Sequence, residues 1–216
     1  MIVAIIGRSY SGKRKLVTYL RNASHGRFRP FKQFTTREDY NKNRHLYMPK
    51  EARDKLEPSR IFYSSFSEEG NEYFSLTTQF QNGGDLIYVM DDPLAIARID
   101  ELGLPYAVVY VDCNTAAIYR KIRSFKELFH AVLSRFSKTR GRLRRMERSG
   151  EYHLYINTSV ASQFNQETMM DIFYRNLCEW EKNRDEHELH PKMFKDSSER
   201  DWLRRARDVG FLMVDI

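Results

Sequence analysis

Residues 2–20 read IVAIIGRSYSGKRKLVTYL, and this stretch decides the fold. Its first part, Ile2–Ile6, is apolar and mostly β-branched, as is typical of a strand buried on both faces. A turn with two glycines follows, and apolar side chains then recur at helical spacing at Leu16, Val17 and Leu20. This spacing predicts a helix that ends near residues 22–26. A buried strand is therefore joined to a helix by a short glycine-containing loop.

Three later runs have the same short, apolar character, and each is followed by polar or turn-forming residues: Leu86–Met90, Ala107–Val111 and Leu154–Ile156. Helices are expected between and after these runs, at residues 94–102, 115–123 and 166–181. Strands that alternate with helices predict an α/β fold, with a mostly parallel sheet and helices on both of its faces.

Two stretches interrupt this alternation. Residues 32–80 are rich in aromatic residues, Thr and Ser, and they predict a small inserted subdomain. Residues 120–148 carry 11 Lys or Arg against 2 acidic residues, which predicts a basic segment ahead of the last strand. The expected core comprises residues 1–31, 81–119 and 149–182, followed by a charged C-terminal extension at residues 183–216.

The loop between the first strand and helix reads GRSYSGK, residues 7–13, and fits the pattern G-x-x-x-x-G-K. Glycines let backbone N–H groups turn inward around a phosphate, the helix start adds partial positive charge, and the lysine neutralises phosphate oxygens. A purely structural turn is the alternative. We expect the loop to bind the phosphates of ATP through Gly7, Ser9, Tyr10, Ser11, Gly12, Lys13 and Arg14.

The residue after the lysine normally supplies a Ser or Thr hydroxyl to Mg²⁺, but here it is Arg14. An arginine cannot bind a cation. Either Mg²⁺ is held by water and phosphates, as its tendency to retain water permits, or the catalytic role has changed. Asp91 follows an expected strand, at the edge where parallel sheets bind ligands. We expect Asp91 to hold Mg²⁺ through water, with capping of the next helix as the alternative.

The sequence resembles guanylate kinase along residues 1–180. The family's loop reads GPSGSGKST, and its register is kept at Gly7, Ser9, Ser11, Gly12 and Lys13. The family's TTR motif is present at residues 35–37, and its strand-ending aspartate is similar to Asp91. Its GNYYGS segment is similar to GNEYFS at residues 70–75, and its YDYxIxN segment is similar to YHLYIN at residues 152–157.

This resemblance implies transfer of a phosphoryl group from ATP to a nucleoside monophosphate, with Mg²⁺ as cofactor. Such a reaction needs positioning and charge neutralisation more than a covalent nucleophile. The resemblance makes residues 32–80 a nucleotide-binding subdomain and residues 120–148 a basic lid. It assigns catalysis to Lys13 and to the lid residues Arg120, Arg123 and Arg135, for which a solvated helix face is the alternative. It adds Asn157 to the ATP contacts. The acceptor contacts that it implies are Arg37, Arg44, Tyr47, Tyr73 and Ser75.

Three acceptor-site positions depart from the family. Its second arginine falls on Tyr40, with Arg44 as the substitute, and one of its serines falls on Gln33. Its base-reading glutamate falls on Ser64. Guanine presents adjacent donors that a carboxylate can satisfy together, whereas one hydroxyl leaves a donor unpaired. The sequence therefore predicts that GMP is a poor or non-preferred acceptor.

The overall composition limits the classes of protein and of partner that remain to be considered. With 41% hydrophobic and 30% charged residues, and no apolar run near the ~18 residues of a membrane span, we expect a cytoplasmic protein without membrane association. Cys113 and Cys178 lie far apart in the sequence and outside any CxxC pattern, so we expect both to be reduced thiols. The net charge of +7 leaves a nucleic-acid partner open. Because Arg14 replaces the expected hydroxyl, a regulatory module that binds a nucleotide without turnover remains an alternative.

Overall fold

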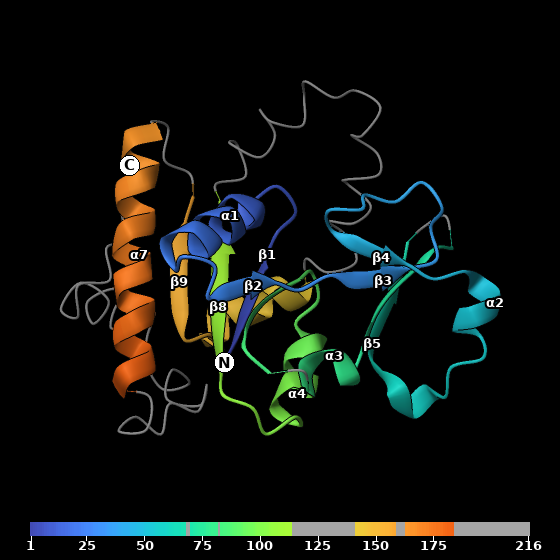
Figure 1. Cartoon of the computed structure of the whole chain (residues 1–216). Coiled ribbons are helices and arrows are strands. Elements are labelled where there is room, and N and C mark those ends of the chain that lie inside the picture. Colours follow the sequence, from blue (N-terminus) through green and yellow to red (C-terminus); the bar gives the residue numbers. More distant parts are fainter. Residues whose placement is uncertain (68–69, 82, 114–140, 159–162, 184–216) are drawn as a thin grey trace.

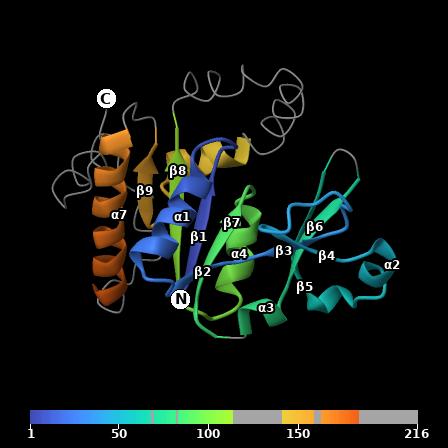
Figure 2. The same cartoon turned by 45° about the horizontal axis from the view of Figure 1, so that its top comes forward.

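The computed structural model describes residues 1–67, 70–81, 83–113, 141–158 and 163–183, and these residues form two sheets that lie side by side (Figure 1, Figure 2). Arg120, Arg123 and Arg135, which are expected in the lid, lie outside the described residues, as does the extension beyond residue 183.

The larger sheet has five parallel strands in the order β2-β7-β1-β8-β9. The strands are β1 (Ile2–Gly7), β2 (Phe28–Pro30), β7 (Asp85–Met90), β8 (Tyr106–Asp112) and β9 (Leu154–Asn157). The central strand β1 is buried at every position, so its apolar side chains pack on both faces and no polar alternation occurs. The expected α/β fold is confirmed.

Helices cover both faces of the larger sheet (Figure 1). On one face lie α1 (Lys13–Ala23) and α7 (Gln163–Asn183), and on the other lie α4 (Leu94–Asp100) and a helix formed by residues 141–149. We call this last one the basic helix. The buried side chains that these helices contribute include Leu16, Leu20, Ile99, Leu143, Met146 and Leu177.

The smaller sheet has four strands in the order β4-β3-β6-β5. They are β3 (Gln33–Thr35), β4 (His45–Tyr47), β5 (Ile61–Phe66) and β6 (Glu72–Leu76). β4 is parallel to β3, whereas β6 is antiparallel to both β3 and β5. Two short helices, α2 (Lys50–Arg53) and η1 (Pro58–Arg60), precede β5, and α3 (Thr78–Gln81) leads back to the larger sheet.

Aromatic packing and a small polar cluster join the two sheets. The Phe80 ring lies 4.7 Å from the Phe31 ring and 4.4 Å from the Phe62 ring, and Tyr88 of β7 packs against the edge of this group. The Tyr88 hydroxyl lies 3.1 Å from Ser75 Oγ and accepts a hydrogen bond from Gln33 Nε2 at 3.2 Å. The smaller sheet is thereby held against β7.

Neither cysteine forms a disulfide: Cys113 is buried and Cys178 is half-buried. Within the part of the chain that the structure describes, no helix is long and apolar enough to cross a membrane.

Candidate functional site

The loop between β1 and α1 contains three residues with a positive φ, two of which are glycines. A Cβ atom on Gly7 would lie 2.1 Å from the carbonyl oxygen of Val111, so glycine is required there. Gly12 has a φ of 96°, and Tyr10 has a φ of 65° although it carries a side chain. Non-glycine residues adopt this left-handed region rarely and at an energetic cost. We call residues 7–13 the phosphate loop from here on, after their predicted ligand.

Lys13 folds back over the phosphate loop. Its ammonium donates hydrogen bonds to the carbonyl oxygens of Gly7 at 2.5 Å and Arg8 at 2.9 Å. It also pairs with Asp91 Oδ1 at 2.9 Å, while only 8% of the residue is exposed. The cation is thus held at the loop, between the ends of β1 and β7. A ligand phosphate at this position would replace one of these three acceptors of the ammonium.

The amino end of α1 adds to the positive potential at the loop. The first backbone N–H groups of a helix have no acceptor within the helix and carry part of the helix dipole. The first turn of α1 contains no acidic residue, and Arg14 in that turn is exposed. An anion is therefore favoured at this end of the helix.

Arg14 also contributes to the electrostatics of β4. Burial lowers the pKa of the His45 imidazole, and the positive charges of Arg44 and Arg14 lower it further. The His45 ring packs edge-on against Tyr73, with 5.2 Å between centroids. The first turn of α1 and β4 of the smaller sheet thus lie within electrostatic range of each other.

The two aspartates at the end of β7 have different partners. Asp91 is 68% exposed at its side chain and pairs with Lys13. Asp92 accepts a hydrogen bond from the backbone N–H of Leu94 at 3.1 Å and pairs with Arg142 of the basic helix. Asp92 thus fixes the backbone just ahead of α4, whereas Asp91 pairs with the lysine of the loop. Arg142 was not singled out in the sequence, because it is one of many arginines in a basic run.

Arg8 lies near the end of β8 and the basic helix. Its guanidinium lies 3.3 Å from Glu147 Oε2 of the basic helix. Burial disfavours the charge on Arg8, but the nearby Asp112, Tyr110 and Glu147 outweigh it and raise the pKa of the guanidinium. Asp112 also accepts a hydrogen bond from the Tyr155 hydroxyl at 3.0 Å. Arg8 thus ties the phosphate loop to the basic helix.

The residues predicted to contact the acceptor divide into two groups. Arg37 donates from Nε and Nη2 to the two carboxylate oxygens of Asp39, and this hydrogen bonding lowers the pKa of the Asp39 carboxyl. Tyr47 stacks on Tyr40 at 5.6 Å, and both belong to the region around β4. Ser75, by contrast, is fully buried beside Tyr88, so a ligand could reach it only if the joint between the sheets opened.

The expected ATP contacts Ser11 and Asn157 differ in burial, since Ser11 is buried and Asn157 is half-buried. Ser11 is fully buried, and its Oγ has no hydrogen-bond partner among the described residues. Asn157 ends β9, where it pairs in register with Asp112 of β8. The next residue, Thr158, was not predicted, yet it is buried and its hydroxyl donates to the Ser11 carbonyl oxygen.

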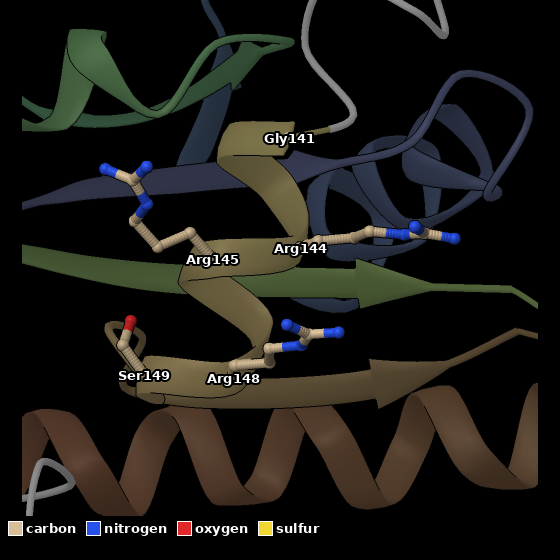
Figure 3. A pocket seen from close by; sticks show the side chains of 5 residues that line it. All are labelled: Gly141, Arg144, Arg145, Arg148 and Ser149. Atoms are coloured by element: carbon tan, nitrogen blue, oxygen red, sulfur yellow. The ribbon is translucent and has the colours of Figure 1, made fainter.

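The basic helix presents three arginines to an open concavity of about 560 Å³, lined by Gly141, Arg144, Arg145, Arg148 and Ser149. Arg144 and Arg148 extend toward the side of the molecule on which the strands end, and Arg145 extends the opposite way (Figure 3). Within the described residues none of these three arginines forms an ion pair. Leu143 and Met146 anchor the opposite side of the helix in the core.

Comparison with known proteins supports the fold and not a sequence family. No protein-family model matches the sequence, and no curated protein matches it either. Among solved structures, the fold is similar to the guanylate kinase from Anaplasma phagocytophilum, with a TM-score of 0.50 and 10% sequence identity. The match covers 95% of this chain and 94% of that chain. The chain therefore has a guanylate-kinase-like fold: a five-stranded parallel sheet flanked by helices, with a separate four-stranded subdomain.

Proposed function

We propose that this chain is a guanylate-kinase-like phosphotransferase that moves the γ-phosphoryl group of ATP to a nucleoside monophosphate or a similar acceptor. The observation that carries the proposal is the geometry of Lys13. Its ammonium donates hydrogen bonds to two carbonyl oxygens of the loop at the amino end of α1, within a fold that resembles guanylate kinase. This is the arrangement expected of a loop that cradles phosphates.

The residues at the loop fit the phosphates of ATP. Gly7 and Gly12 allow the tight backbone path, Lys13 supplies a buried positive charge, and the amino end of α1 supplies the positive end of the helix dipole. For Mg²⁺, Asp91 offers an exposed carboxylate beside Lys13, which suits a metal held through water. Mg²⁺ would supply further neutralisation of phosphate charge. Asn157 and the lid residues Arg120, Arg123 and Arg135 belong to the same proposal.

The acceptor would bind over the smaller sheet. Arg44, Tyr47 and Tyr73 lie on or beside β4 and β6, on the side that Arg14 influences electrostatically. Arg37 would have to exchange Asp39 for the acceptor phosphate. Ser64 lies on β5 opposite Phe74, where a carboxylate would be needed to read guanine. We therefore infer that an acceptor other than GMP is preferred.

The experiment is a steady-state assay of ADP release with ATP, Mg²⁺ and each of GMP, AMP, CMP and UMP. The proposal expects turnover with at least one monophosphate and weak turnover with GMP. Efficient turnover of GMP with discrimination against the others would contradict the acceptor inference. ADP binding without turnover of any monophosphate would favour a module that holds a nucleotide, a reading that Arg14 and the Arg37–Asp39 pair support.

A nucleic-acid partner is a second candidate, which the arginines of the basic helix favour. Arg144, Arg145 and Arg148 are exposed, and guanidinium groups bind phosphates strongly. Fluorescence anisotropy with labelled single-stranded and double-stranded RNA and DNA tests it. Salt-dependent binding that Arg144→Ala and Arg148→Ala weaken together would support this candidate. Equal binding by the double variant would exclude these two arginines as the contact, and no binding by the unmodified chain would exclude the candidate.

A further inference from the structure

Thr158 directly follows β9, at the point where the end of this strand contacts the phosphate loop. Its backbone N–H donates to the Asp112 carbonyl oxygen at 2.9 Å, which fixes it beside β8. Its hydroxyl donates to the Ser11 carbonyl oxygen and also lies 3.1 Å from the Asp112 carbonyl oxygen. The residue is only 6% exposed.

The contact with the loop is steric as well as polar. A Cβ atom on Gly12 would lie 3.1 to 3.3 Å from the side chain of Thr158, which is tighter than ordinary packing. Gly12 therefore presses directly against this side chain, in the left-handed conformation that precedes α1. The position of Thr158 thus limits which conformations the peptide between Ser11 and Gly12 can adopt.

The direction of that peptide determines what the loop offers to a ligand. A peptide bond is planar and trans, so its N–H points opposite to its C=O. Because the Ser11 carbonyl oxygen is directed at Thr158, the Gly12 N–H is directed away from Thr158. If the peptide flipped, a carbonyl oxygen would face an incoming phosphate in place of a donor.

We propose that Thr158 is a positioning residue for phosphate binding, which holds the Ser11–Gly12 peptide with its N–H turned toward the ligand. This inference rests on the proposed phosphate binding at the loop. Thr158 does not touch the ligand. It reduces the reorganisation that the loop undergoes on binding, because the donor already has the required orientation.

The experiment compares ADP and inorganic pyrophosphate binding, by calorimetric titration, to the full chain and three variants. Thr158→Val keeps the shape and removes the hydroxyl, whereas Thr158→Ser keeps the hydroxyl. Ser24→Ala is the matched control, because Ser24 is a buried hydroxyl that bonds the backbone at the other end of α1. Thermal unfolding of each ligand-free protein sets a titration temperature at which all are folded.

The expected result is about tenfold weaker binding of both ligands by Thr158→Val, the loss typical of one buried hydrogen bond. Thr158→Ser should bind within about threefold of the unmodified protein, and Ser24→Ala within about twofold. Equal affinity in Thr158→Val and the unmodified protein would overturn this inference alone. If the unmodified protein bound neither ligand, the proposed function would fail first, and this inference with it.

Discussion

Arg14 is the second residue of α1 and stands where the loop pattern expects a hydroxyl. Replacing it with serine restores an oxygen ligand and removes a positive charge that competes with a cation. We expect Arg14→Ser to raise the Mg²⁺ affinity of the ATP complex by roughly two- to tenfold, the range of one added polar contact. Calorimetric titration of Mg²⁺ with ATP present measures it, with Arg21→Ser in the last turn of α1 as control. An unchanged Mg²⁺ dependence would place the metal elsewhere.

His45 gives the folded protein a specific dependence on pH. Burial, Arg44 and Arg14 together lower the pKa of its imidazole below 6.5. Between the folded-state pKa and 6.5, the unfolded chain binds more protons than the folded protein, so the free energy of unfolding falls as the pH falls. Urea unfolding at pH 7.5 and 5.5 should show a smaller difference for His45→Gln than for the unmodified chain. Identical pH dependence of the two proteins would contradict this assignment.

At the scale of elements, the core strands were predictable because burial on both faces produces short apolar runs. β1, β7, β8 and β9 all contain the runs expected of them. β2 was missed because it has three residues and ends in proline. The smaller sheet was expected only as a region, since its strands are short and pair with distant partners. Local patterns do not encode such pairing.

The basic helix is held to the sheet by apolar side chains as well as by ion pairs. Leu143 is 3% exposed within the core between this helix and the sheet. We expect Leu143→Ala to lower the free energy of unfolding by about 2–5 kcal/mol, because it leaves a cavity. Arg145→Ala on the same helix should change it by less than about 0.5 kcal/mol. Urea unfolding measures both, and similar values for the two variants would contradict the packing described.

The whole molecule brings together residues that lie far apart in the sequence. Asp91 of the β7 end reaches Lys13, Glu147 of the basic helix reaches Arg8, and Thr158 reaches Ser11 across 147 positions of sequence. The loop itself was recognisable from the sequence because the strand, the glycines, the lysine and the helix follow one another within residues 2–20. The side chains that contact the loop, Asp91, Glu147 and Thr158, come from three distant segments, and only the tertiary structure brings them to it. The roles predicted for individual site residues remain predictions.

The central claim is that the phosphate loop binds nucleotide phosphates through Lys13, and calorimetric titration with ADP tests it most directly. The unmodified chain should bind ADP, and Lys13→Ala should bind about 10- to 100-fold more weakly, because the variant loses a charged hydrogen-bond donor. Lys15→Ala, an exposed lysine two residues along α1, removes the same charge and should stay within about threefold. Equal ADP affinity in the unmodified chain and Lys13→Ala, or no ADP binding by the unmodified chain, would contradict the account.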